Sequence, residues 1–242
     1  MRHIILAVPA LFLASCGHAE SGGSDSSAIG SRSFALADFD QVALRGSDNV
    51  NVVVGKSFSV SATGPESALD QLDIFVEGGV LKIGRKSGSS WHIGWSRKDE
   101  RDVKITVTMP SIRGAKLAGS GDMAVDRATA DAFKVSLAGS GDLKVGNVQA
   151  KSVALSLAGS GDVEIAGRTG SIDISGAGSG NVMANALEAE TADISLAGSG
   201  NVSARATGSA SVSIMGSGDV AISGTDKCKT SKLGSGSVTC KA

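Results

Sequence analysis

The chain has 242 residues, of which 41% are hydrophobic and 19% charged, and its formal net charge at pH 7 is −1. Glycine supplies 33 residues and aromatic residues only 3%. Because each glycine costs a helix about 1 kcal/mol, this composition argues against a helical bundle and favours an all-β protein, and a net charge near zero argues against nucleic acid as a partner.

The first 15 residues have the pattern of a bacterial lipoprotein signal peptide. Arg2 precedes an apolar run over residues 4–13, which is shorter than the roughly 20 residues that span a bilayer. The run ends in Leu13-Ala14-Ser15-Cys16, which resembles a lipobox. We therefore expect residues 1–15 to be removed and Cys16 to carry lipid. The alternative is an ordinary cleaved signal peptide with an incidental cysteine.

Residues 16–33 are polar and rich in glycine and serine, so we expect a flexible tether between a lipid anchor and a folded body. In known sorting rules, aspartate directly after the lipidated cysteine favours retention in the inner membrane. Gly17 stands at that position. The resemblance therefore favours an outer-membrane lipoprotein, facing either the periplasm or the cell surface, with the membrane as a partner through the anchor.

Residues 34–113 contain apolar runs typical of strands at irregular spacing, and a short helix is expected to begin at Pro65. A charged insert over residues 85–102 interrupts them and holds both tryptophans. One interpretation is a patch for a sugar or protein partner, because exposed aromatic residues beside basic ones are common at interfaces. The other is a hairpin whose tryptophans fold onto the body. The residues of the possible patch are Trp91, Trp95, Arg97 and Lys98.

Residues 114–242 contain a repeat of Gly-Ser-Gly-Asp/Asn. Its copies begin at residues 119, 139, 159, 178, 198 and 216, with a variant at 234. Apolar residues stand at even offsets from the first glycine and polar residues at odd offsets, so each unit reads as strand, glycine corner, strand and variable return turn. A period of about 18–20 residues predicts a parallel β-helix with right-handed coils. Residues 34–113 are expected to form wider first coils that cap this single body, residues 34–242.

Several motifs of the chain, and the order in which they follow one another, resemble those of the bacterial family called putative auto-transporter adhesin, head GIN domain. They are Phe39, Val42 and Leu44 at the start of the body, the run from Val103 to Pro110, and the glycine-rich repeats. The resemblance covers about residues 36–225. It implies an exported β-solenoid, often a lipoprotein, and it supplies no active-site motif.

A column of acidic and amide residues follows each glycine corner. Its members are Asp122, Asp142, Asp162, Asn181, Asn201 and Asp219. Stacked carboxylates about 5 Å apart must be solvated or bridged by a cation. Calcium-binding β-rolls use a period of nine residues and two half-sites for each ion, and the second half-site is missing here. We therefore favour turn chemistry, in which Asp and Asn cap their own backbone, over calcium binding by Asp122, Asp142 and Asp162.

Two classes of function stay open. The first is a non-catalytic envelope scaffold for adhesion, binding an unknown glycan or protein. The second is a carbohydrate-active β-helix enzyme of the lyase or hydrolase type. The acids are spread along a column rather than clustered in a carboxylate pair, and His92 is the only histidine of the body. We therefore expect no catalytic residue, cofactor or metal.

Cys228 and Cys240 stand six residues before and six after Gly234, so both fall on inward columns of the last coil. An exported chain meets an oxidising compartment, in which paired cysteines form disulfides. We therefore predict a disulfide that closes the C-terminal end. The alternative is a pair of free buried thiols.

Overall fold

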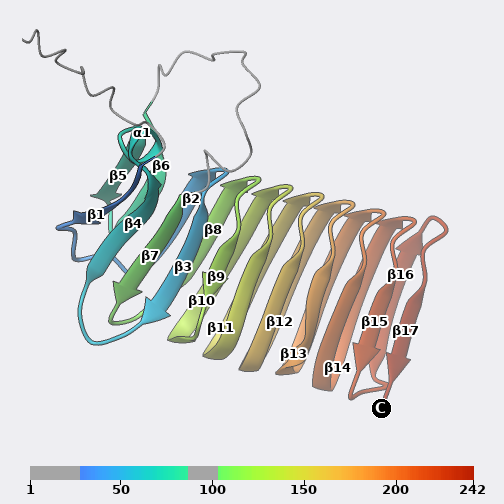
Figure 1. Ribbon diagram of the computed structural model, residues 1–242. Helices are drawn as coiled ribbons and strands as arrows, with labels where there is room; N and C mark the ends of the chain where they lie inside the picture. The colour runs from blue at the N-terminus through green and yellow to red at the C-terminus, as the bar shows by residue number, and fades with distance from the viewer. Residues whose placement is uncertain (1–27, 87–102) are drawn as a thin grey trace, which may run out of the picture.

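The computed structural model describes residues 28–86 and 103–242, and Figure 1 shows them as a row of stacked strands. The described residues contain 17 strands in one sheet and one short helix, α1 (Glu66–Leu69), which begins after Pro65. The predicted β-solenoid is confirmed. Among the described residues, no helix is long and apolar enough to cross a membrane.

The strands divide into an N-terminal group, a group of long coils and a C-terminal pair of short strands around the last corner. Their bounds are β1 (Ile29–Phe34), β2 (Gln41–Gly46), β3 (Asn49–Val54), β4 (Ser59–Pro65), β5 (Leu72–Glu77), β6 (Val80–Arg85), β7 (Lys104–Met109), β8 (Gly114–Gly119), β9 (Met123–Val125), β10 (Ala128–Gly139), β11 (Leu143–Gly159), β12 (Val163–Gly178), β13 (Val182–Gly198), β14 (Val202–Gly216), β15 (Val220–Ser223), β16 (Cys228–Leu233) and β17 (Val238–Lys241).

From β8 to the C-terminus, successive coils pair in parallel with their glycine corners in register. Gly139 of β10 lies opposite Gly159 of β11, and Gly159 lies opposite Gly178 of β12. Residues at even offsets from the corner point inward, as predicted: Leu137 and Leu157, for example, are at most 3% exposed. Small apolar side chains fill this narrow interior, so the core closes with few aromatic residues.

From β10 to β14, the return segment of each coil is a third wall and not the turn that we predicted. Strand β11 runs unbroken through it, and Val148 is fully buried there. Its inward column continues through Ala128, Val148, Gly167 and Leu187. The register shifts on this wall, for instance between Val145 and Val148. The repeats differ in length by one or two residues, and these differences fall in the return segment. The alternation of buried and exposed residues is therefore interrupted there in the sequence.

Each corner of the repeat from Gly119 onward has glycine at two positions, because adjacent coils meet backbone to backbone there. The first glycines of the repeats have φ between +125° and +143°. A Cβ on Gly141, the second glycine of its corner, would lie 1.9 Å from the carbonyl oxygen of Gly121. The backbone amides of Ser160 and Gly161 both donate to the carbonyl oxygen of Gly139, at 2.9 and 3.1 Å.

The N-terminal coils are not stacked in sequence order. Strands β2 and β3 pair in parallel with β8 and β9 on one side and with β6 and β7 on the other. Strands β2 and β3 therefore form an inner coil, and β6 and β7 form an outer coil on one side of it. The chain then returns to the other side of the inner coil, where β8 and β9 pair with it. Gly46 lies opposite Gly119, so Gly46-Ser47-Asp48 is a further corner. The sequence does not reveal it because Asp48 replaces the second glycine.

Three strands of the N-terminal region are antiparallel and do not form coils, contrary to our expectation. Strand β1 pairs with β4, β4 with β7, and β5 with β6. They lie at the N-terminal end of the row in Figure 1, where they cap the stack. The tether predicted over residues 16–33 is wrong for residues 29–33, because these belong to β1 and pair with the edge of β4.

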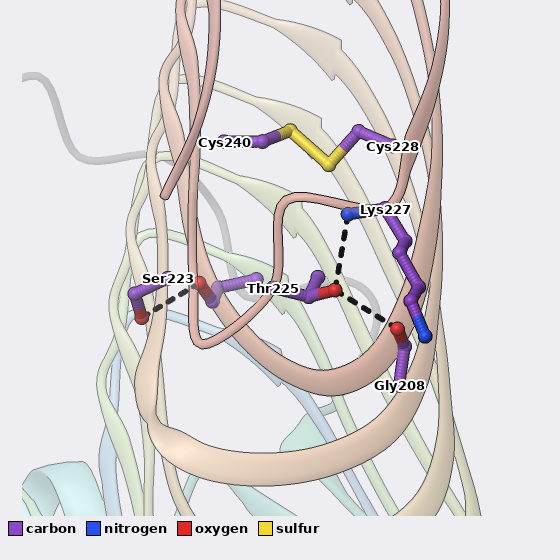
Figure 2. Close-up of a disulfide and its surroundings, with 7 residues drawn as sticks. Gly208, Ser223, Thr225, Lys227, Cys228 and Cys240 are labelled. Carbon is purple, nitrogen blue, oxygen red and sulfur yellow. Dashed lines mark hydrogen bonds between the residues drawn. A yellow bond between two sulfur atoms is a disulfide. The ribbon is translucent and has the colours of Figure 1, made fainter. Parts of the chain in front are cut away.

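The C-terminal coil is held by a disulfide between Cys228 and Cys240, the pair named from the sequence (Figure 2). Their Cα atoms lie 6.6 Å apart. Beneath the disulfide, the buried Thr225 donates its hydroxyl to the carbonyl oxygen of Gly208 at 2.9 Å and accepts the amide of Lys227 at 3.1 Å. The disulfide therefore joins β16 to β17, the last two strands of the described residues.

Removing this disulfide is expected to loosen the last coil without unfolding the body. In the chain-entropy model, a bond that closes a loop of this size stabilises by about 3 kcal/mol. In Cys228→Ser/Cys240→Ser, amide exchange in β16 and β17 should accelerate by about two orders of magnitude, measured by hydrogen–deuterium exchange. The amides of β11 and β12 are the internal control. Unchanged exchange in β16 and β17 would show that the disulfide is not the cap.

Candidate functional surfaces

The Asp/Asn column forms a continuous hydrogen-bonded ladder. In each step, the Oδ1 atom of one residue accepts the backbone amide of its counterpart in the next coil, at 2.8–3.1 Å. Its members are Asn49, Asp122, Asp142, Asp162, Asn181, Asn201 and Asp219, and Ser237 is the final donor. Asn49 joins because it follows the corner that the sequence concealed.

These side chains therefore cap the neighbouring coil, and our prediction that they cap their own backbone is wrong. In addition to its backbone amide, Asn181 donates a hydrogen bond from its side-chain Nδ2 to Oδ1 of Asp162, at 2.9 Å. Aspartate and asparagine are interchangeable here because both offer an Oδ1 acceptor at the same distance from the backbone. Within residues 28–86 and 103–242, no group of three or more His, Cys, Asp or Glu residues could hold a metal ion.

Asp162→Ala is expected to lower the free energy of unfolding by about 1 kcal/mol, because the amide of Asn181 loses its side-chain acceptor. Asp162→Asn keeps an Oδ1 acceptor and is the matched control, with a change close to zero. Urea unfolding followed by circular dichroism measures both. If calcium stabilised the parent protein but not Asp162→Asn, the column would be a cation site and the capping role would be incomplete.

Acid is expected to weaken the last step of the ladder. The hydroxyl of Ser237, at 2.7 Å, and its amide, at 2.8 Å, both donate to Asp219, so the pKa of Asp219 lies below its usual value of 3.8, with a smaller contribution from Lys232. The stabilisation is complete above that value and is lost as pH falls through the lowered pKa. A titration of the Ser237 amide resonance should show its midpoint below 3.8. A midpoint at or above 3.8 would contradict this assignment.

The third wall carries ion pairs between successive coils. Lys151 lies 2.8 Å from Asp131, and Glu188 lies between Arg168, at 3.3 Å, and Arg205, at 3.5 Å. Of these residues, Lys151, Arg168 and Glu188 line a shallow groove of about 770 Å³. The sequence did not indicate these pairs, because their spacing becomes meaningful only when the return segment is known to be a wall.

A second groove, of about 680 Å³, runs across β12, β13, β14 and the start of β16. It presents hydroxyls and carboxylates at equal positions on successive coils. Asp173, Asp193, Ser211 and Lys229 form one row, in register. A parallel row consists of Ser171, Thr191 and Ser209. Such rows can donate and accept hydrogen bonds along an extended polar ligand.

The remaining residues named from the sequence cannot be placed on these surfaces. Cys16, Trp91, Trp95, Arg97 and Lys98 lie outside the described residues. Most of the insert predicted over residues 85–102 lies outside them as well, but Arg85 belongs to β6.

Arg85 contacts the corner of the neighbouring coil. Its Nε lies 3.1 Å from Asp48, and a terminal nitrogen of the same guanidinium also donates to that carboxylate. The Asp48 side chain is fully buried, whereas Arg85 is 28% exposed. Among the described corners, this is the one at which Asp replaces the second glycine, and the ion pair neutralises the buried carboxylate there. The role of the ion pair is therefore structural.

The chain matches one family model and several crystal structures. The model for the putative auto-transporter adhesin, head GIN domain matches residues 38–225. A putative adhesin from Bacteroides fragilis is 20% identical, with a TM-score of 0.79 over 89% of this chain and 98% of its own. A putative lipid binding protein from Parabacteroides distasonis is 26% identical, with a TM-score of 0.69 over 88% and 96%. No curated protein matches the chain.

Proposed function

The chain belongs to the putative auto-transporter adhesin, head GIN domain family, and from this membership we propose that it is a non-catalytic lipoprotein of the cell envelope whose solenoid binds an envelope glycan or protein. In this proposal, acylated Cys16 anchors the chain in the outer membrane. The solenoid is the binding part. Its strands are fixed by neighbours on both sides, so their side chains keep a constant spacing.

The observation that carries the proposal is the second groove. Its rows repeat hydroxyl and carboxylate groups at the spacing of adjacent strands, about 4.8 Å. A polymer with repeated hydroxyl groups, such as a glycan, can match several members of such a row at once. The acids of the ladder, by contrast, each have an oxygen bound to a backbone amide, so their arrangement is explained without chemistry on a substrate.

A glycan array tests this proposal with the mature chain, from residue 16 onward. Asp173→Ala/Asp193→Ala should weaken binding to any glycan retained by the parent at least tenfold. Asp131→Ala, on the third wall, is the matched control and should bind as the parent does. A polysaccharide that is cleaved, with new reducing or unsaturated ends, would overturn the non-catalytic proposal. Equal binding by Asp173→Ala/Asp193→Ala and the parent would show that the second groove does not bind the glycan.

The anchor is tested separately. Cells grown with an alkyne fatty acid should label the parent protein and not Cys16→Ser. Equal labelling of the two would show that Cys16 is not the acylated residue, while leaving the groove untouched.

A further inference from the structure

The C-terminal end of the solenoid combines positive charge with exposed apolar side chains. We call this surface the C-terminal tip. It consists of Lys227, Lys229, Lys232, Lys241, Met215 and Leu233. In Figure 1 the tip lies at the end of the row opposite the antiparallel cap, beside β16 and β17. From the structure we propose that the tip docks onto an anionic phospholipid surface.

The charge of the tip differs from that of the rest of the described chain. Residues 226–241 contain four lysines and one aspartate, whereas residues 28–86 and 103–225 contain 15 basic and 18 acidic residues. All four lysines are exposed. Lys232 is close enough to Asp219 to affect its titration, but within the described residues none of the four forms an ion pair. The body is therefore polarised, with its positive end at the tip.

The apolar side chains of the tip interrupt a column of alanines. The position before the first glycine is occupied by Ala118, Ala138, Ala158, Ala177 and Ala197 in successive coils. From β8 onward, only the last two coils change it, to Met215 and Leu233, which are 63% and 68% exposed and lie opposite one another in β14 and β16. In the inner coil of β2, the polar Arg45 stands at this position. The larger apolar residues thus appear in the same place as the lysines.

Lysines at an open sheet edge also prevent strands of other molecules from pairing with it. That role accounts for Lys232, which stands where the previous coil has the buried Ile214. It does not account for Met215 and Leu233, since exposed apolar residues at an edge promote association. An acidic polymer would match the lysines but leave both apolar side chains in water. Two tips facing one another would repel.

An anionic lipid surface satisfies both features together. Apolar side chains enter the boundary between headgroups and acyl chains, and surrounding lysines extend their ammonium groups to the phosphates. Each lysine near such a surface strengthens binding about fivefold, and the attraction falls with ionic strength. Lys229 and Leu233 lie on the same outward face of β16, so both can reach one surface. Lys227 and Lys229 also line one end of the second groove. The inference rests on the charge and the apolar side chains of the tip, and it stands if the chain binds no glycan or carries no acyl chain.

Vesicle sedimentation tests the proposal with the chain from residue 16 onward, secreted behind a cleavable leader and carrying Cys16→Ser so that no acyl chain is attached. The protein should bind vesicles of phosphatidylcholine with a quarter phosphatidylglycerol. It should not bind pure phosphatidylcholine, and 0.5 M salt should release it. Lys227→Gln/Lys229→Gln/Lys232→Gln should weaken binding about a hundredfold. Met215→Ala/Leu233→Ala, which restores the alanine of the other coils, should weaken it at least tenfold.

Two variants away from the tip are matched controls. Lys144→Gln and Met183→Ala change an exposed lysine and an exposed methionine on another wall, and both should bind as the parent does. Equal binding to both vesicle types would overturn the proposal. Full binding by Met215→Ala/Leu233→Ala, with displacement by polyglutamate, would identify an acidic polymer instead. An oligomer in sedimentation velocity that Leu233→Ala dissolves would identify a second copy as the occupant.

Discussion

Alanine in place of Gly141 is expected to lower the free energy of unfolding by at least about 3 kcal/mol. The added Cβ would lie 1.9 Å from the carbonyl oxygen of Gly121 in the neighbouring coil. That oxygen belongs to backbone held in register on both sides, so it cannot move as the end of a side chain can. The two coils must separate, and the corner hydrogen bonds of Ser140 and Gly141 to Gly119 weaken with them. Urea unfolding followed by circular dichroism measures the loss.

Two control variants separate this close approach from other effects. Gly78→Ala adds a Cβ where no atom lies within 4 Å but where φ is +59°, so it should cost only about 1 kcal/mol in backbone strain. Ser140→Ala removes an exposed hydroxyl from the same corner and should change stability by less than 0.5 kcal/mol, about the usual range for surface substitutions. A loss at Gly141 no greater than at Gly78 would contradict the importance of coil-to-coil contact.

Arg85→Ala is expected to destabilise the protein by about 3–5 kcal/mol, because it leaves the buried carboxylate of Asp48 without its guanidinium partner. The charge cannot easily be hydrated, since the Asp48 side chain is fully buried. Thermal unfolding measures the loss. Asp48→Asn introduced into Arg85→Ala removes the isolated charge and should recover part of the lost stability.

An exposed ion pair supplies the comparison. Lys144→Ala removes the partner of Glu164, at 2.7 Å, where the two side chains are 62% and 46% exposed. Solvent screens such pairs, so this loss should stay below about 1 kcal/mol. Equal losses in Arg85→Ala and Lys144→Ala would show that burial of Asp48 does not make its ion pair important. Failure of Asp48→Asn to recover stability would point to lost packing by Arg85.

The regular coils could be predicted because each structural constraint on a coil selects a residue type at a fixed offset from the corner glycine. Burial selects leucine at Leu137 and Leu157, and contact with the neighbouring backbone selects glycine at Gly141. A backbone amide that needs an acceptor selects Asp162. The disulfide was predictable for the same reason, since both cysteines fall on inward columns of one coil. Alternation shows which face of a strand is buried.

Alternation does not show which strand lies beside another, or in which direction. For this reason the order of the N-terminal coils and the antiparallel pairs of β1, β4 and β5 could not be predicted. The third wall was missed because insertions shift its register, and with it the charged pairs around Glu188. The two grooves were missed with it. They depend on side chains of different coils that only the correct stacking brings together.

The coil order at the N-terminal end also has a consequence for how the chain folds as it emerges from synthesis or export. Neighbouring repeats lie 18–20 residues apart, so each new coil can join as soon as it appears. The inner coil of β2 and β3 is different: its Val50 lies opposite Met123. That contact spans more than 70 residues, and closing so long a loop slows its formation. One side of the inner coil therefore stays without a partner until β8 and β9 appear, and only then can the row of repeats extend from it.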